Sequence, residues 1–228
     1  MKKVLVVDIG GTHVKLMLSR ANKRKFDSSP RMGPRALVAG IKAAVAGWKF
    51  DAISIGFPAP VRDGRILKEP SHLGKGWIGY NFASALRKPV RVINDAAMQA
   101  LGSYRGKRML FLGLGTGIGS AMMWPGTLLP LELGHLPYVD DGILEDRLGK
   151  IGLEELGRKA WQREVLEVAN QMKIAFVADY VVLGGGNSKI LEKLPAGVVL
   201  GENRNAYLGG TRLWQMIPGT KRSRWQIL

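Results

Sequence analysis

Apolar and polar positions follow two kinds of pattern along this chain, and together they predict a mixed α/β protein. Short continuous apolar runs bounded by glycine or proline are typical of buried strands. Apolar residues recurring every three or four positions are typical of amphipathic helices packed on a core. We therefore expect strands at 3–9, 14–18, 25–28, 52–56, 90–93, 108–114, 118–124 and 180–183, and helices at 35–48, 82–87, 96–101, 144–176 and 209–216.

The two halves of the chain show the same order of predicted elements. A strand hairpin opens the chain at 3–28, and a second one opens its other half at 108–135. Crossover helices and further strands follow each hairpin. This repetition predicts two related α/β domains, residues 1–106 and 107–228, with a ligand-binding cleft between them.

The second half contains a long helical pattern over residues 144–176. Gly149, Gly152 and Gly157 are expected to break it, because glycine is a poor helix former. The apolar stripe in the later part of this segment is expected to belong to the core, and the helices offer an apolar surface for a homodimer. The basic tail that begins at Pro218 is expected to be mobile.

Composition is ordinary for a globular protein with a core: 46% of the 228 residues are hydrophobic and 23% are charged. The absence of cysteine excludes disulfides and thiolate metal sites. The three histidines, His13, His72 and His135, are far apart in sequence, which argues against a zinc site. No apolar run has the length of a secretory signal or a membrane span, so we expect a cytoplasmic protein without membrane contact.

The charge balance is unusual. Thirty-four basic residues against eighteen acidic ones give a net charge of +16, which attracts polyanions such as nucleic acid, anionic membranes, nucleotides or inorganic polyphosphate. The alternative is a solvated surface, and we prefer it for the clusters at 23–25 and 221–224. Aromatic residues are not interleaved with the basic ones, apart from Trp225 in the tail, so nucleic acid is not expected as a partner.

The first candidate site is the glycine turn after the opening strand. Gly10 and Gly11 allow backbone N–H groups to approach a phosphate closely. Thr12 adds a hydroxyl group and Lys15 a positive charge. Asp8, at the end of the strand, is a candidate to hold Mg²⁺ through water. The alternative is an ordinary hairpin turn.

The second candidate is a glycine-rich turn between the two strands of the central hairpin. Glycine occupies every second position from Gly113 to Gly119. This arrangement costs conformational entropy unless another group lies close to the backbone. We therefore favour phosphate binding over a purely structural bend. The candidate contacts are Gly115, Thr116, Gly117 and Gly119.

The third candidate is the triplet Gly184-Gly185-Gly186, which follows the predicted strand at 180–183. A helix is expected to begin directly after it, capped by Asn187 or Ser188. Such a helix start can receive the phosphate or sugar of a nucleotide. A flexible turn without a ligand explains the triplet equally well.

Polar side chains of two further segments match the chemistry of a sugar. Asn94 and Asp95 come at the carboxyl end of a predicted strand, where ligands bind in open sheets. A carboxylate there can act as a general base, although both residues also cap helices well. Glu132, His135 and Glu145 offer carboxylates and an imidazole to sugar hydroxyls. The alternative for His135 is a solvated or structural histidine.

In this order, the motifs resemble those of the ROK family of sugar kinases, members of the actin-like ATPase fold with two domains and a central cleft. The glycine motifs resemble the first phosphate, second phosphate and adenosine motifs of that family. The polar residues resemble its sugar-binding asparagine, its catalytic aspartate, its E-x-G-H signature and a further sugar-binding glutamate. The matching segments are 8–15, 113–119, 184–186, 94–95, 132–135 and Glu145.

Two departures narrow the resemblance. Most of the family carries a cysteine-rich zinc motif after E-x-G-H, whereas this chain has no cysteine and a short stretch up to Gly184. Both features resemble the polyphosphate glucokinase branch, as does the segment 51–80, and no zinc is expected. His72 stands where related sequences often have asparagine, which changes one contact in the sugar loop. No helix-turn-helix precedes Asp8, so a repressor is not expected.

The resemblance implies a phosphotransferase that uses polyphosphate, ATP or both, with Mg²⁺, to phosphorylate the 6-hydroxyl of glucose. Asp95 would be the catalytic base, and Asn94, Glu132, His135 and Glu145 would bind the sugar. The three glycine turns, with Asn187, would bind the donor, and the resemblance also implies a homodimer. The alternatives are an ATP-dependent kinase for mannose, fructose or an amino sugar, and a non-catalytic protein of the same fold that binds a sugar or polyanion.

Overall fold

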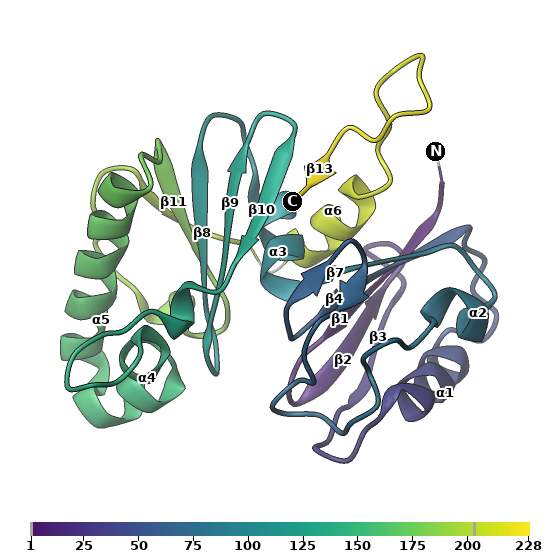
Figure 1. Cartoon of the computed structure of the whole chain (residues 1–228), viewed down its shortest axis with the longest axis horizontal. Helices are drawn as coiled ribbons and strands as arrows, with labels where there is room; N and C mark the ends of the chain where they lie inside the picture. The colour runs from purple at the N-terminus through teal and green to yellow at the C-terminus, as the bar shows by residue number, and fades with distance from the viewer. Residues whose placement is uncertain (1, 203) are drawn as a thin grey trace.

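The computed structural model describes residues 2–202 and 204–228, which form two β-sheets on either side of a pair of crossed helices (Figure 1). The first sheet has the strand order β3-β2-β1-β4-β7, and the second has the order β12-β11-β8-β9-β10-β13. A small hairpin, β5 with β6, accompanies the first sheet. The strands are β1 Val4–Ile9, β2 His13–Met17, β3 Lys23–Asp27, β4 Ala52–Phe57, β5 Val61–Arg62, β6 Arg65–Ile66, β7 Val90–Asn94, β8 Met109–Leu114, β9 Ile118–Trp124, β10 Thr127–Leu131, β11 Tyr180–Gly184, β12 Val198–Leu200 and β13 Gln226–Ile227.

Helices cover both sheets. In the described part of the chain they are α1 Pro34–Ala44, α2 Phe82–Leu86, α3 Asp95–Ser103, α4 Leu144–Leu148, α5 Lys150–Ala175 and α6 Asn205–Arg212, with short 3₁₀ helices η1 Leu133–His135 and η2 Asn187–Ile190. The helices α4 and α5 cover the outer face of the second sheet, and α3 and α6 lie between the two sheets (Figure 1). None of these described helices combines the length and the apolar character needed to cross a membrane.

The first sheet brings three strand ends to one edge. β1, β4 and β7 run parallel, with Asp8 beside Gly56 and Phe57 beside Asn94. β1 and β4 are buried on both sides, which explains their continuous apolar sequences. The β1–β2 hairpin, antiparallel, adds the first glycine turn to the same edge. The candidate residues at 8–12 and 94–95 are therefore neighbours in the fold.

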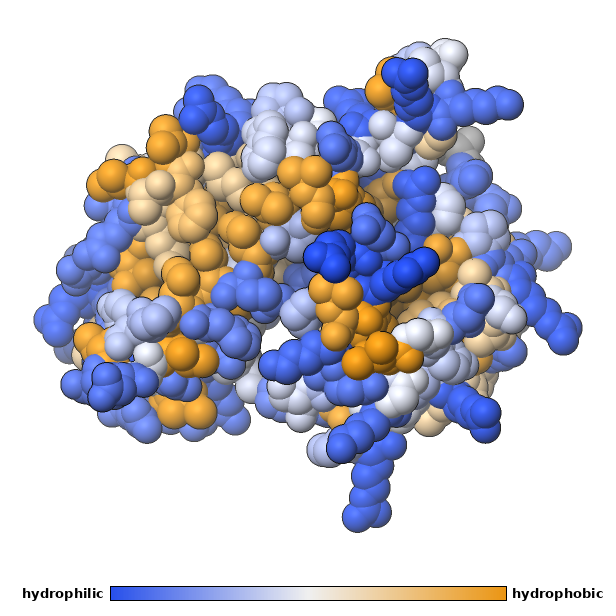
Figure 2. Space-filling model, in the orientation of Figure 1, coloured by the Kyte–Doolittle hydropathy of each residue, from blue (hydrophilic) through white to orange (hydrophobic). Residues whose placement is uncertain are grey.

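The second sheet presents its own glycine turns in the same way. β8 and β11 run parallel, and β9 returns antiparallel to β8, so the turns after β8 and after β11 lie at the same end of the sheet. The turn between β8 and β9 and the turn between β1 and β2 lie at the lower end of the space between the two lobes in Figure 1. The space-filling view shows a gap there, flanked by hydrophilic side chains (Figure 2).

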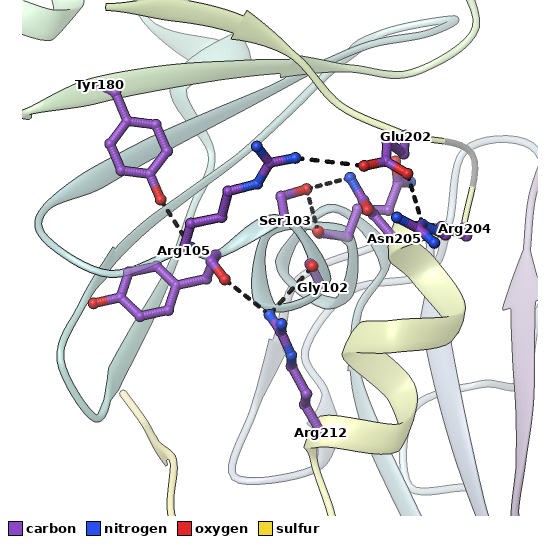
Figure 3. A network of polar contacts seen from close by, with 10 residues as sticks. Gly102, Ser103, Arg105, Tyr180, Glu202, Arg204, Asn205 and Arg212 are labelled. Atoms are coloured by element: carbon purple, nitrogen blue, oxygen red, sulfur yellow. Dashed lines mark hydrogen bonds and ion pairs between the residues drawn. The ribbon is translucent and has the colours of Figure 1, made fainter.

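The two crossed helices, α3 and α6, approach so closely that only glycine fits at their contact. A Cβ atom on Gly102 would overlap the carbonyl oxygen of Asn205, and one on Gly209 would overlap that of Met98. At one end of the crossing, Asn205 Nδ2 donates a hydrogen bond to Ser103 Oγ at 2.7 Å (Figure 3). The Arg212 guanidinium donates to the carbonyl groups of Leu101 and Gly102 in α3 and of Tyr104, the residue after α3.

The core between the sheets contains residues from both halves of the chain. Val4 and Val6 of β1 pack in one buried cluster with Phe111 of β8 and Trp225 of the tail. Two further clusters lie under α1 and under α5. The division into domains at residues 1–106 and 107–228 stays a prediction.

Most predicted elements are present, and the exceptions have local causes. The strand β10 was not predicted; its sequence contains Pro130, a residue that is uncommon within strands. The last helix begins at Asn205 rather than at Gly209, because close packing against α3 requires glycine inside the helix. Gly149 and Gly157 interrupt the helical segment as predicted, but Gly152 lies within α5, so that prediction was wrong.

The tail departs from its prediction as well. Gln226 and Ile227 form β13, which pairs in parallel with β10. Trp225 is buried and meets the ring of Tyr104 edge-on, with ring centroids 5.7 Å apart. The prediction of a mobile tail was therefore wrong for its last residues, because burial of a large aromatic side chain opposes the entropy of a free end.

Candidate functional site

Asn94 and Asp95 lie where the first sheet meets the central helices. Asn94 ends β7, and its Oδ1 accepts a hydrogen bond from the Ala97 amide at 3.0 Å, so the capping interpretation is confirmed for Asn94. Its Nδ2 lies 3.4 Å from the Ala59 carbonyl oxygen. Asp95 begins α3 and accepts a hydrogen bond from the Ala96 amide at 2.8 Å. The helix thus holds both side chains at the carboxyl end of β7.

Two carboxyl groups in this region have perturbed acidity. Burial raises the pKa of Asp95 to about 7, and the charges of Asp8 and Glu132 add to the rise, while the Ala96 hydrogen bond opposes it. Burial also raises the pKa of Asp8, against the ammonium group of Lys15. The Lys15 Nζ lies 4.0 Å from Asp8 Oδ2. A carboxyl group that titrates near neutrality is suited to general-base catalysis.

The first glycine turn is closed tightly and leaves amide groups free. The Gly10 amide donates to the His13 carbonyl at 3.0 Å, and Ser28 Oγ donates to the Gly10 carbonyl at 2.7 Å. Within the described residues, the amides of Gly11 and Thr12 have no protein acceptor. Two adjacent free N–H groups are what an anion-binding turn requires.

His72 lies directly beside this first turn. A Cβ on Gly11 would stand 3.5 Å from the Cβ of His72 and within 4 Å of its ring. The resemblance placed His72 in a sugar loop. In the structure His72 lies against Gly11 of the first glycine turn.

The second glycine turn has the same character. The Gly115 amide donates to the Gly117 carbonyl at 3.0 Å, and the Thr116 carbonyl accepts from the Lys150 amide at 3.1 Å. The amides of Thr116 and Gly117 have no protein acceptor in the part of the chain that is described. A Cβ on Gly119 would lie 2.5 Å from the Cβ of Ala96, so β9 packs directly on the helix turn that carries Asp95.

Glu145 supports this second turn. Its Oε2 accepts a hydrogen bond from the Ile118 amide at 3.1 Å, and its carboxylate lies against Gly117. The sequence resemblance assigned Glu145 to the sugar. The structure shows that it orders the backbone of the second turn, a contact that the sequence motifs did not indicate, while its assignment to the sugar stays a prediction.

Glu132 directly precedes η1, and His135 is the last residue of η1. Ser120, buried in β9, donates to the Leu131 carbonyl and accepts from the Leu133 amide, both at 2.9 Å, and so fixes the start of η1. Burial raises the pKa of Glu132, with His135 and Lys68 opposing the rise and Glu145 adding to it. The predicted sugar-binding groups are therefore within electrostatic reach of one another.

Lys68 was missed by the sequence analysis. It follows β6 in an irregular segment and opposes the rise in the Glu132 pKa. Only the basic character of the segment could have indicated it, because a single lysine outside a motif carries no positional signal.

The third glycine turn packs behind the second one. Gly185 has a φ of +81°, and a Cβ there would overlap the Leu114 carbonyl oxygen. Asn187 Nδ2 donates to the Gly115 carbonyl at 2.9 Å, and Ser188 Oγ donates back to the Gly185 carbonyl at 2.9 Å. The prediction that Asn187 or Ser188 caps a helix was wrong, because Gly186 occupies the cap position of η2 and no side chain caps it.

The donor set near Asp8 fits Mg²⁺ but is no complete metal cage. No group of three or more histidine, aspartate or glutamate side chains in the described residues is arranged to hold a metal ion. Mg²⁺ is typically held by one or two carboxylates together with substrate phosphates and water. Asp8 and Asp95 are close enough for the charge of Asp8 to raise the Asp95 pKa, which a cation would relieve.

A separate cavity of about 170 Å³ lies at the far end of α3. Arg105 and Arg204 both pair with the carboxylate of Glu202 there, and Tyr180 accepts a hydrogen bond from the Arg105 amide (Figure 3). None of the residues predicted to form the functional site lines this cavity. Its polar groups contact one another, and it is part of the packing around the helix crossing.

Comparison with known proteins gives a consistent picture. The model of the ROK family matches residues 4–143. The polyphosphate glucokinase of Mycobacterium tuberculosis is 31% identical over 173 residues, which cover 69% of this chain and 63% of that protein. The glucokinase of Pyrobaculum calidifontis is 29% identical over 147 residues, covering 59% and 50%. The chain thus spans less than two thirds of the length of these curated relatives.

A solved structure shares the fold. The inorganic polyphosphate/ATP-glucomannokinase from Arthrobacter sp. strain KM aligns with a TM-score of 0.77 and 22% identity, over 92% of this chain and 96% of that one. This likeness confirms the predicted fold, the α/β actin-like ATPase fold.

Proposed function

The chain belongs to the ROK family, and from this premise we propose that it is a sugar kinase that phosphorylates the 6-hydroxyl of glucose. Its donor is inorganic polyphosphate, ATP or both. The observation that carries the proposal is the position of Asp95, the first residue of α3, the helix that lies between the two sheets. Its carboxyl group has a pKa of about 7.

Asp95 accepts the proton of the sugar hydroxyl in this reaction. The hydroxyl oxygen then forms a bond to the terminal phosphorus of the donor, and the bond from that phosphorus to its bridging oxygen breaks. The shortened polyphosphate or ADP leaves with the electron pair. Phosphoryl transfer depends mainly on positioning and electrostatic stabilisation, so the free amides of the two glycine turns are suited to hold the donor phosphates.

Asp8 would hold Mg²⁺ when the donor is bound, and the ion would neutralise charge on the phosphate oxygens. Lys15, 4.0 Å from Asp8, adds a positive charge on the same side. Thr12 and Thr116 lie in the two turns and offer hydroxyl groups to the donor. The third turn, with Asn187, supports the second one and is the candidate site for a nucleotide.

The sugar is held by Asn94, Glu132, His135 and Glu145. Each offers oxygen or nitrogen atoms that match hydroxyl groups, and the electrostatic coupling of Glu132 with His135 and Glu145 supports a common site for these three. Glu145 would connect the sugar site with the donor site, since its carboxylate also accepts a hydrogen bond from the Ile118 amide at the second turn. We further propose that the two α/β halves close on the substrates, which excludes water and limits hydrolysis of the donor.

The proposal for polyphosphate rests on the relatives and on charge. The Mycobacterium relative is named a polyphosphate glucokinase, and the net charge of +16 attracts an anionic donor. A homodimer and a cytoplasmic location remain expectations.

The first experiment incubates the purified protein with glucose and Mg²⁺ and measures glucose 6-phosphate. Long-chain polyphosphate and ATP are offered separately, and mannose, fructose and glucosamine replace glucose in parallel reactions. We expect product from glucose with at least one donor and a loss of at least about 10²-fold in turnover for Asp95→Asn. Full turnover in this variant would show that Asp95 is not the base, and absence of product from every pair would refute the kinase.

A further inference from the structure

A row of lysines crosses the first sheet, starting beside the candidate site. β1 and β2 pair Asp8 with Lys15, and β2 and β3 pair Lys15 with Lys25. Residues directly opposed in antiparallel strands project from the same face. Lys23 lies two residues before Lys25 on β3 and opposes Met17 of β2. Alternate residues of a strand project from the same face, so Lys23 is the third lysine on this face.

This face is the one turned toward the central helices. Val6 packs in the cluster that includes α3, whereas Val7 packs in the cluster under α1. Side chains alternate along a strand, so Asp8 lies on the same face as Val6. The row from Asp8 through Lys15 to Lys25 therefore leads from the side of the sheet that carries the candidate site to the outer strand, β3.

The positive charge of this row is not neutralised within the protein. Lys15, Lys23 and Lys25 are exposed, and the side chain of Lys15 is 69% exposed even beside Asp8. Among the described residues, Lys23 and Lys25 form no ion pair, and Asp27 on the same strand pairs with His13 at 3.7 Å. Like charges directly opposite each other destabilise a sheet. The register itself follows from Val14 and Phe26, which pair on the opposite face and pack under α1. Its consequence is that the three lysines gather on one exposed face.

We propose that Lys15, Lys25 and Lys23 form a track for the distal part of a linear polyphosphate donor whose terminal phosphoryl group reacts at Asp95. This inference rests on the proposed function. Adjacent strands lie about 4.8 Å apart and alternate residues about 6.7 Å apart, so the backbones of the three lysines are spaced closely enough for their long side chains to contact one chain of phosphates.

The track also separates the two donors. The candidate nucleotide turn at 184–186 belongs to the second sheet, whereas the lysine row belongs to the edge of the first one. The outer part of polyphosphate would therefore contact β3, and the nucleoside of ATP would not. The preference for long polyphosphate over short donors would depend on lysines that ATP never touches.

The test replaces Lys23 and Lys25 by glutamine together. The matched control is Lys159→Gln with Arg163→Gln, which removes two exposed positive charges from α5 on the outer side of the second sheet. KM is measured for long-chain polyphosphate, tripolyphosphate and ATP. One exposed charge contact changes an equilibrium by up to about fivefold. We therefore expect the KM for long-chain polyphosphate to rise about tenfold relative to the other two donors, and the control to leave this ratio unchanged.

A binding measurement separates the track from the reaction. Fluorescently labelled long-chain polyphosphate is titrated against Asp95→Asn with and without the two glutamines, and the salt dependence of Kd is recorded. We expect weaker binding and a shallower salt dependence in the triple variant. An equal loss for all donors, an equal loss in the control or an unchanged Kd would overturn the track while leaving the kinase intact. If no donor gave a phosphorylated sugar while polyphosphate binding still depended on Lys23 and Lys25, the kinase proposal would be overturned and the track would stand.

Folding is checked by thermal unfolding. Removing the charge of Lys25 opposite Lys15 relieves repulsion, so the Tm of the glutamine variant should equal or exceed that of the parent. A reduced preference for long-chain polyphosphate over tripolyphosphate and ATP, at an unchanged Tm, then reports on binding rather than on damage to β3.

Discussion

Replacing Asp95 by asparagine is expected to stabilise the folded protein while removing its activity. The carboxyl group has a pKa of about 7 in the folded state against an ordinary value of 3.8, chiefly because it is buried. The folded state therefore binds the proton of Asp95 more tightly than the unfolded state does. Stability that depends on this group is complete below about pH 4 and falls as the pH rises toward 7.

The magnitude follows from the shift. A rise from 3.8 to about 7 corresponds to about 4 kcal/mol of lost stability at pH 8, and to about 2 kcal/mol at pH 5. Asparagine has nearly the same shape and stays neutral, and its amide oxygen can still accept the hydrogen bond from Ala96. The variant avoids the cost of burying a charge and keeps the start of α3.

Urea unfolding at pH 5 and pH 8 measures this difference. The gain in unfolding free energy of Asp95→Asn over the parent should grow by about 2–3 kcal/mol between the two pH values. Asp63→Asn, in the exposed turn between β5 and β6, controls for loss of a carboxylate outside the site. A gain that is the same at both pH values, or a loss at pH 8, would refute the argument that Asp95 is held as a buried acid.

Four further outcomes are expected. The kcat/KM of the parent should rise with pH through an apparent pKa near 7, as Asp95 ionises, and a profile flat from pH 5 to 9 would contradict this. Gly102→Ala should destabilise the protein by at least about 3 kcal/mol in urea unfolding, because its Cβ would overlap Asn205. Gly186→Ala, with open space and a negative φ, should change stability by less than about 1 kcal/mol. Trp225→Ala should cost about 3–5 kcal/mol and lower the Tm, whereas a free tail would give no change.

The strands that consist of an apolar run followed by a glycine turn could be predicted from the sequence, because burial and turn chemistry are local signals. It located Asp8, Asn94 and Asp95 at strand ends, and the parallel register of β1, β4 and β7 then brought them together. The register itself was not predictable, since it depends on which strands become neighbours. The same limit applies to the lysine row, where Lys23 and Lys25 are adjacent to Arg24 in sequence but only the first two share a face with Lys15.

Other features were missed because they depend on contacts across the fold. Glycine at 185 fits a phosphate loop, yet the structure gives a packing reason for it in the carbonyl of Leu114. Glu145 was assigned to one ligand on the basis of a motif, while its hydrogen bond to the Ile118 amide ties it to a turn. The order of Trp225 depends on Tyr104, more than a hundred residues away.

If the two halves close on their substrates as proposed, the packing of α3 on the second sheet couples that closure to the position of Asp95. Asp95 is fixed to the first sheet through β7, and the next residue, Ala96, touches Gly119 of the second sheet, where a Cβ would lie only 2.5 Å away. Gly119 follows directly on the turn that would hold the donor. Any rotation of one sheet against the other must therefore move the donor turn about a pivot beside the base. In the proposed kinase, this arrangement would let the halves open for exchange of substrates while Asp95 and the second turn stay close together.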